Sequence, residues 1–174
     1  KDAANLIRRV PETVATVGLF VDPKDALVGS VLDKTNVDFL QLHGDESPER
    51  IYELKALTGL PIIKVLKVAN EEDLDLLRAY EAVAEKFLFD ARAPKEMENA
   101  LPGGNALSFD WQLLAGRDWA APWILAGGLT AENVAEAVRI SGADAVDVSS
   151  GVEDRPGVKN VGKISAFIEA AGSV

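Results

Sequence analysis

Short apolar segments alternate along the chain with amphipathic ones, and this pattern predicts strands that alternate with helices. The segment 13–21, TVATVGLFV, is apolar and β-branched almost throughout, as is typical of a strand buried on both faces of a parallel sheet. Other short segments share this character. The six predicted strands span residues 13–21, 37–42, 61–68, 86–90, 122–126 and 145–149.

Helices are predicted between these strands, from apolar residues at helical spacing and from residues that favour helix N-termini. Asp22, Ser47 and Asn70 are the expected N-caps of three of them, and residues 130–133 cap a fourth. A long loop is expected over residues 91–107. The predicted helices span residues 1–10, 23–34, 48 onward, 70–80, 109–117, 131–140 and 161–171.

Strands that alternate with helices indicate an α/β fold with a parallel sheet and helices outside it. An open doubly wound sheet is one candidate, but no G-x-G-x-x-G follows the first predicted strand. The sequence therefore favours a (β/α)8 TIM barrel. With six parallel strands, we expect residues 1–174 to be a single barrel domain that lacks the first two βα units and is N-terminally incomplete.

The composition narrows the classes of partner. The formal net charge is −10 and the sequence pI is about 4.6, which argue against nucleic acid and anionic membranes as partners. The chain has 0 cysteines and 1 histidine, so we expect no disulfide, no metal and no cofactor. No apolar stretch approaches the roughly 20 residues of a membrane span, so a soluble, cytoplasmic protein is expected.

Two glycine-rich junctions follow the last two predicted strands. They are Gly127-Gly128 and Ser150-Gly151. Backbone N–H groups are easily approached by a phosphate at glycine, and barrels build their phosphate site after the last two strands. A single Gly-Gly could be only a tight turn, but the pair favours a phosphate site.

Two aspartates lie where strands of a barrel carry functional groups. Asp90 ends an apolar strand, where burial favours the protonated carboxyl that a general acid needs; a capping role is an equal alternative. Asp147 lies inside the last strand, where it could bind substrate hydroxyls. Its alternative is an ion pair with Lys64 or Lys67.

His43 is the only histidine, and it follows a predicted strand. It could contact substrate or transfer a proton, although a simple hydrogen bond to the neighbouring Asp45 or Glu46 is the favoured interpretation. Gln41 alternates with leucines and is expected to point into the barrel. Lys64 and Lys67 should face opposite sides of their strand, so one of them could be functional.

Several segments, in this order along the chain, resemble phosphoribosylanthranilate isomerase. The resemblance covers essentially the whole sequence. It rests on the segments GLFV at 18–21, QLHGDE at 41–46, FLFD at 87–90, GG at 103–104 with FDW at 109–111, LAGGL at 125–129 with ENV at 132–134, and VDVSSGVE at 146–153.

The resemblance implies a cofactor-free Amadori rearrangement of N-(5-phosphoribosyl)anthranilate in tryptophan biosynthesis. It assigns Asp90 as general acid and the loops of Gly127, Gly128, Ser150 and Gly151 to the phosphate, and places Asp147 near the ribose. Gln41 and His43 are expected among the substrate contacts. The loop around Gly103 and Gly104 could be a lid.

Three features of the family have no counterpart here. The cysteine base in a Lys-Ile-Cys-Gly stretch and the arginine that grips the anthranilate carboxylate are absent from the sequence, and Ala106 replaces a loop glycine. The alternative function is therefore a non-catalytic phosphate-binding or fragment-assembly module. A phosphorylated small molecule is the expected ligand in either case, and the full-length protein is expected to be a monomer.

Overall fold

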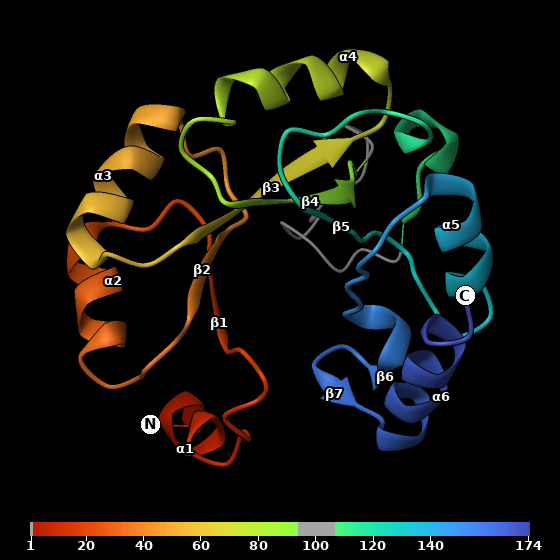
Figure 1. The fold of residues 1–174 in the computed structure, drawn as a ribbon. Helices are drawn as coiled ribbons and strands as arrows, with labels where there is room; N and C mark the ends of the chain where they lie inside the picture. Colours follow the sequence, from red (N-terminus) through yellow and green to blue (C-terminus); the bar gives the residue numbers. More distant parts are fainter. Residues whose placement is uncertain (1, 94–106) are drawn as a thin grey trace.

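A curved parallel sheet with helices on its outer side forms the centre of the molecule (Figure 1). The computed structural model describes residues 2–93 and 107–174. Within them the five sheet strands are all parallel and lie in chain order. They are β1 (Val17–Phe20), β2 (Phe39–Leu42), β3 (Ile62–Val68), β4 (Lys86–Ala91) and β5 (Trp123–Leu125).

Helices connect successive strands, as the alternating pattern predicts. The α-helices are α1 (Asp2–Ile7), α2 (Asp25–Leu32), α3 (Pro48–Thr58), α4 (Glu71–Asp75), α5 (Val134–Ser141) and α6 (Val161–Ala171). Three 3-10 helices are η1 (Leu76–Ala79), η2 (Trp111–Leu114) and η3 (Ser150–Val152). An antiparallel hairpin, β6 (Glu153–Arg155) with β7 (Val158–Lys159), follows η3.

Alternation along the strands divides the buried side chains between two layers. On the inner face, Ile63, Val65, Leu88 and Ala126 form a small cluster. The neighbours of these residues in sequence point outward and form two larger clusters with the helices, one of them around Leu40 and Leu42. Because the side chains of a strand alternate, the inner face also receives Gln41 and Asp90.

The sixth predicted strand, 145–149, is not formed as a strand. Val146 makes a single parallel bridge to Leu125, supported by hydrogen bonds from the Leu125 nitrogen to the Ala145 oxygen and from the Asp147 nitrogen to the Leu125 oxygen. The described sheet therefore has five strands and one bridged segment, not six strands. The segment turns into η3 at Ser150, which limits the pairing.

Two predicted helices are not formed as single α-helices. The predicted helix 109–117 is only the 3-10 turn η2, and the predicted helix 70–80 divides into α4 and η1. Within residues 2–93 and 107–174, no helix is both long and apolar enough to cross a bilayer.

The predicted N-caps have different outcomes. The hydroxyl of Ser47 accepts from the Arg50 nitrogen, and Asn70 forms a capping box with Asp73, so both predictions are confirmed. Asp22 is not an N-cap, because α2 begins at Asp25 after Lys24. Instead Asp22 has a positive φ of 45°, and its carboxylate accepts from the Asp45 nitrogen at 2.8 Å. The Asp22 side chain therefore accepts a tertiary hydrogen bond instead of capping α2.

Candidate functional site

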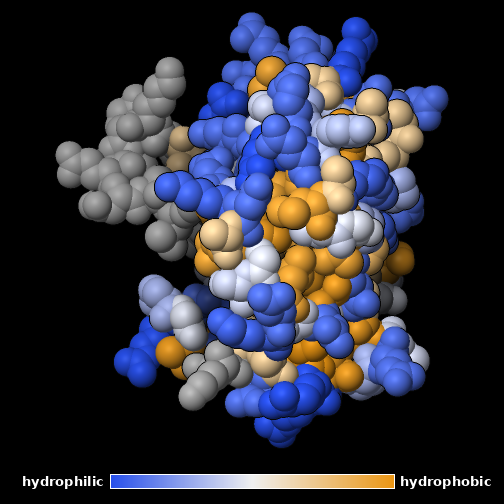
Figure 2. Space-filling view, turned by 90° about the vertical axis from the view of Figure 1, so that its left-hand side faces the viewer, coloured by the Kyte–Doolittle hydropathy of each residue, from blue (hydrophilic) through white to orange (hydrophobic). Residues whose placement is uncertain are grey.

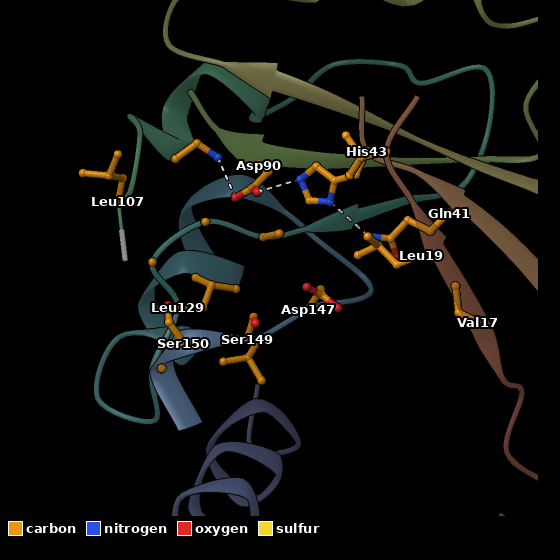
Figure 3. A pocket seen from close by; sticks show the side chains of 17 residues that line it. Val17, Leu19, Gln41, His43, Asp90, Leu107, Leu129, Asp147, Ser149 and Ser150 are labelled. Atoms are coloured by element: carbon orange, nitrogen blue, oxygen red, sulfur yellow. Dashed lines mark hydrogen bonds and ion pairs between the residues drawn. The ribbon is translucent and has the colours of Figure 1, made fainter. Parts of the chain in front are cut away.

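A pocket of about 550 Å³ opens at the carboxyl ends of the strands (Figure 3). Apolar side chains form part of its wall, and polar groups from three separate strand ends converge on it. The polar side chains that line it are Gln41, His43, Asp90, Asp147, Ser149 and Ser150. An apolar wall with a few convergent polar groups is typical of a small-molecule site.

Asp90 is at the centre of a row of hydrogen bonds inside this pocket. His43 Nε2 lies 3.2 Å from Asp90 Oδ2, and the Ala91 nitrogen donates to Asp90 Oδ1 at 2.8 Å. Gln41 Nε2 lies 3.5 Å from His43 Nδ1. Gln41, His43 and Asp90 are all buried. The structure thus brings together three residues predicted for the site, from β2 and β4.

The partner of His43 differs from the favoured prediction. Neither Asp45 nor Glu46 contacts its ring; Asp90, 47 residues further along the chain, does. Glu46 instead pairs with Lys64 at 2.7 Å. The interpretation of His43 as a histidine satisfied by its sequence neighbours is therefore wrong.

Asp147 faces the same pocket from the segment bridged to β5 (Figure 3). The Asp147 side chain is exposed to solvent in the open pocket. Protein atoms further from the carboxylate still surround it and reduce its solvation. This partial desolvation, together with the negative charge of Asp90, raises the pKa of Asp147 above its ordinary value; His43 and Lys159 act in the opposite direction. Within the described residues Asp147 makes no ion pair, so the predicted pairing with Lys64 or Lys67 is not formed.

Lys64 does not point into the pocket. It lies on the outward face of β3, in line with Ile62 and Leu66, and its ammonium binds Glu46 Oε2 and the Gly44 carbonyl, each at 2.7 Å. Lys67 has the opposite parity and pairs in register with Asp90. The prediction that the two lysines face opposite sides is consistent with the alternation of β3.

The two glycine-rich junctions form one side of the pocket. Gly127 and Gly128 have φ values of 88° and 63°, which favour glycine. A Cβ on Gly127 would lie 2.7 Å from the Ala91 nitrogen, and one on Gly128 would lie 2.7 Å from the Leu107 oxygen. A Cβ on Gly151 would overlap the Leu129 carbonyl. Glycine is therefore required by the close packing of both junctions.

Within residues 2–93 and 107–174, no protein acceptor takes the backbone N–H groups of Gly127, Gly128, Ser150 or Gly151. Asn133 stabilises the first junction, because its side chain donates to the Gly128 oxygen and accepts from the Thr130 nitrogen. Free N–H groups on two adjacent, rigid loops can bind an anion.

Lys159 is a charged neighbour of this site that sequence reasoning missed. Hairpin β6–β7 brings its ammonium to the Ser149 carbonyl at 2.8 Å and to Glu153 at 2.8 Å. No local pattern indicates this contact, since the hairpin has only two short strands. Alternation along 13–21 could have identified the apolar wall residues Val17, Leu19 and Val21.

The predicted lid around Gly103 and Gly104 lies outside the described residues. In the part of the chain that is described, no group of three or more histidine, cysteine or acidic side chains is arranged to hold a metal ion.

A family model and curated relatives point to one family. The family model for N-(5'phosphoribosyl)anthranilate (PRA) isomerase matches residues 1–170. The N-(5'-phosphoribosyl)anthranilate isomerase of Paramagnetospirillum magneticum is 58% identical over 169 residues, which are 97% of this chain and 78% of that protein. The corresponding protein of Rhodospirillum centenum is 54% identical over 172 residues, 99% of this chain and 80% of that protein.

Solved structures show the same likeness. Phosphoribosyl anthranilate isomerase from Thermotoga maritima is 31% identical with a TM-score of 0.85, over 99% of this chain and 80% of that one. A phosphoribosyl anthranilate isomerase in complex with reduced 1-(o-carboxyphenylamino)-1-deoxyribulose 5-phosphate is 30% identical with a TM-score of 0.81, over 99% and 79% of the two chains.

Proposed function

Because this chain belongs to the N-(5'-phosphoribosyl)anthranilate isomerase family, we propose that its pocket carries out the steps of that reaction described below. The protein is the isomerase of tryptophan biosynthesis that converts N-(5'-phosphoribosyl)anthranilate into 1-(2-carboxyphenylamino)-1-deoxyribulose 5-phosphate. The observation that carries the proposal is a buried carboxyl, Asp90, that lines one pocket with two loops whose backbone N–H groups have no acceptor among the described residues.

The fold is proposed to be a single (β/α)8 barrel domain, of which this chain contributes six βα units. The five strands β1 to β5 and the bridged segment at Val146 would occupy six successive strand positions of the barrel. The likeness to the Thermotoga maritima isomerase supports this assignment. The glycine junctions follow the last two of these strand positions, which is the usual place of a barrel's phosphate site.

Asp90 is proposed to be the general acid. Its carboxyl proton moves to the furanose ring oxygen, the C1–O bond breaks with its electron pair going to that oxygen, and the nitrogen lone pair forms a C1=N bond. Loss of the C2 proton then gives an enolamine, and the ketone forms when C1 gains a proton and the hydroxyl on C2 loses its proton. This chain has 0 cysteines, and we assign the removal of the C2 proton to none of its residues.

The phosphate is proposed to bind the N–H groups of Gly127, Gly128, Ser150 and Gly151. Support comes from their free donors, from the lack of Cβ atoms at three of the four positions, and from the nearby positive charge of Lys159. The net charge of −10 does not oppose this, because close N–H groups outweigh a diffuse field at short range.

Asp147 is proposed to accept hydrogen bonds from the ribose hydroxyls, and Gln41 and His43 to contact the substrate from β2. All three line the pocket. The raised pKa of Asp147 supports a carboxylate that gains from a hydroxyl donor, because a donor replaces part of the solvation that the site removes.

The test is isomerase turnover by the purified chain, followed by the fluorescence change of the anthranilate group. Asp90→Asn should lower kcat roughly 10²- to 10⁴-fold. It should still bind the reduced product analogue in calorimetry, because the phosphate loops are unchanged. Asp45→Asn is the matched control, since the Asp45 carboxylate is exposed and only its backbone nitrogen is bonded.

Two outcomes would contradict the proposal. If Asp90→Asn retained full turnover, Asp90 would not be the acid. If the unaltered chain bound the analogue but never turned over substrate, the alternative of a phosphate-binding module would describe this chain better.

A further inference from the structure

We propose that His43 is a positioning residue for Asp90. His43 donates its Nε2–H to the Asp90 carboxylate, in the neutral tautomer that Gln41 selects. This inference rests on the proposed role of Asp90 as general acid. It gives His43 a task within the protein beyond its expected contact with substrate.

His43 and Asp90 come from strand ends that are not neighbours in the sheet. β3 lies between β2 and β4 in the sheet. His43 and Asp90 nevertheless approach to 3.2 Å across the inner face (Figure 3). The side chains of His43 and Asp90 are only 8% and 11% exposed, so water cannot readily replace this bond. Among the described residues, loss of His43 would leave Asp90 with only the Ala91 N–H, and loss of Asp90 would leave His43 with only Gln41.

Neighbouring carboxylates do not compete for His43. Glu46 binds Lys64, the Gly44 nitrogen and the Asp22 nitrogen. Asp22 accepts from the Asp45 nitrogen. These contacts hold the turn after β2, so His43 is directed toward the pocket and Asp90 is the carboxylate within its reach.

Gln41 determines which ring nitrogen carries the proton. The amide nitrogen of Gln41 faces His43 Nδ1, at 3.5 Å. In this orientation the amide nitrogen of Gln41 donates, so we assign Nδ1 as the acceptor and place the ring proton on Nε2. Nε2 faces the Asp90 carboxylate, which accepts it.

Both hydrogen-bond donors to Asp90 stabilise the carboxylate anion. The His43 Nε2–H binds Oδ2 and the Ala91 N–H binds Oδ1, and hydrogen bonds to a carboxylate favour its charged form. They orient the carboxylate and stabilise the anion that forms as the furanose oxygen takes the proton. His43 therefore contributes most where charge develops on Asp90, which affects kcat rather than substrate binding.

Other charged groups also face this pair. Asp147 lines the same pocket, Lys159 binds the pocket residue Ser149, and Lys67 on β3 pairs in register with Asp90. The charges of Asp147, Lys159 and Lys67 also contribute to the electrostatic environment of His43 and Asp90. A pH experiment must therefore compare variants that leave these three groups unchanged.

The direct test uses the fact that the chain has 1 histidine. In an untagged protein labelled with 15N-histidine, two-bond nitrogen–proton correlations report a single imidazole. At neutral pH we expect the Nε2–H tautomer, a mixture of tautomers in Gln41→Leu, and an upfield shift of the Nε2 proton in Asp90→Asn. A predominant Nδ1–H tautomer in the unaltered protein would overturn the proposal.

The kinetic test compares His43→Leu, which removes the donor, with His43→Gln, which retains an N–H of similar reach. We expect His43→Leu to lower kcat about tenfold and His43→Gln to recover most of that loss. A raised KM with unchanged kcat would contradict the proposal.

Failure of this inference is distinguishable from failure of the proposed function. If Asp90 were not the acid, Asp90→Asn would retain turnover while the imidazole still showed the Nε2–H tautomer. If His43 did not position Asp90, Asp90→Asn would lose turnover while His43→Leu left kcat unchanged.

Discussion

Glu46 and Lys64 form an ion pair almost completely removed from solvent, with side chains that are 1% and 2% exposed. Burial alone would raise the pKa of Glu46, but the hydrogen bond and charge of Lys64 and the Asp22 N–H outweigh it, and the pKa is lowered. The pair joins the turn after β2 to β3, next to His43. This ion pair therefore holds the turn that lies next to His43 in the site.

We expect Lys64→Met to destabilise the protein by roughly 3–5 kcal/mol, because Glu46 would remain buried without a cation. Urea unfolding of the single variants and of Lys64→Met with Glu46→Leu would measure this. The double variant should be less destabilised than the sum of the two single variants. Additive losses would show that the two side chains do not interact.

Asp147 gives a prediction on pH. Its folded-state pKa is raised by desolvation and by Asp90, so the folded protein is penalised at neutral pH. This penalty disappears as pH falls through the raised value toward the ordinary value of about 3.9. Asp147→Asn should therefore be more stable than the unaltered protein at pH 7 but not at pH 3.5.

The same substitution should weaken binding of the reduced product analogue roughly tenfold, because a charged acceptor for hydroxyls is lost. Chemical unfolding at several pH values and calorimetry would measure the two effects. Asp144→Asn, an exposed aspartate just before the same segment, is the control and should change neither. A stability gain that persisted unchanged at pH 3.5 would contradict the electrostatic explanation.

At the scale of elements, the loop between β5 and α5 is shaped by its two left-handed glycines and by Asn133. Asn133 links the Gly128 carbonyl to the Thr130 nitrogen, so the loop is braced from the helix end. The loop also packs against the main chain at Ala91 and Leu107. Its shape therefore depends on β4 as well as on its own sequence.

We expect Gly128→Ala to lower the affinity for inorganic phosphate more than tenfold and to destabilise the fold by roughly 1–3 kcal/mol. The new methyl would lie 2.7 Å from the Leu107 carbonyl, in a backbone conformation that alanine disfavours. Calorimetric titration and thermal unfolding would measure these effects.

Gly116→Ala is the matched control for that variant. Gly116 has a similar φ of 65°, but nothing lies within 4 Å of a Cβ placed there. It should carry the conformational cost alone, roughly 1 kcal/mol, with unchanged phosphate affinity. Equal loss of phosphate affinity in both variants would argue against this loop as the phosphate site.

At the scale of the whole molecule, strand β1 is at one end of the described sheet and presents apolar side chains to solvent. Val17, Leu19 and Val21 are 44%, 56% and 41% exposed. Figure 2, which looks at the side of the molecule with the N-terminal elements, shows apolar side chains gathered in a band among hydrophilic ones. An apolar end strand with unpaired backbone groups favours association with another chain.

We therefore expect this chain to associate as its concentration rises, measured by sedimentation velocity. Leu19→Lys should reduce the association, because a charge on the strand disfavours edge pairing and burial. Leu57→Lys is the control, since Leu57 is similarly exposed, at 54%, but lies on α3. Equal effects of both substitutions would show that β1 is not the contact.

Much of the fold and some of the site followed from consecutive residues. The alternation of apolar segments predicted the parallel order of β1 to β5, and capping residues placed the start of α3 and α4. The glycine junctions and Asp90 were found because they directly follow apolar strands. Such patterns depend on backbone geometry and burial, which repeat every two residues in a strand and every 3.6 in a helix.

Tertiary structure alone decided which side chains meet. His43 binds Asp90, 47 residues away, instead of its acidic neighbours, and Asp22 binds the next loop instead of capping α2. The segment around Asp147 is bridged at one residue rather than paired as a strand. These outcomes depend on sheet curvature, strand register and the competition between partners, which no short stretch of sequence contains. The sequence by itself determined the family, the order of elements and the chemical groups of the pocket; the folded sheet determined their pairing.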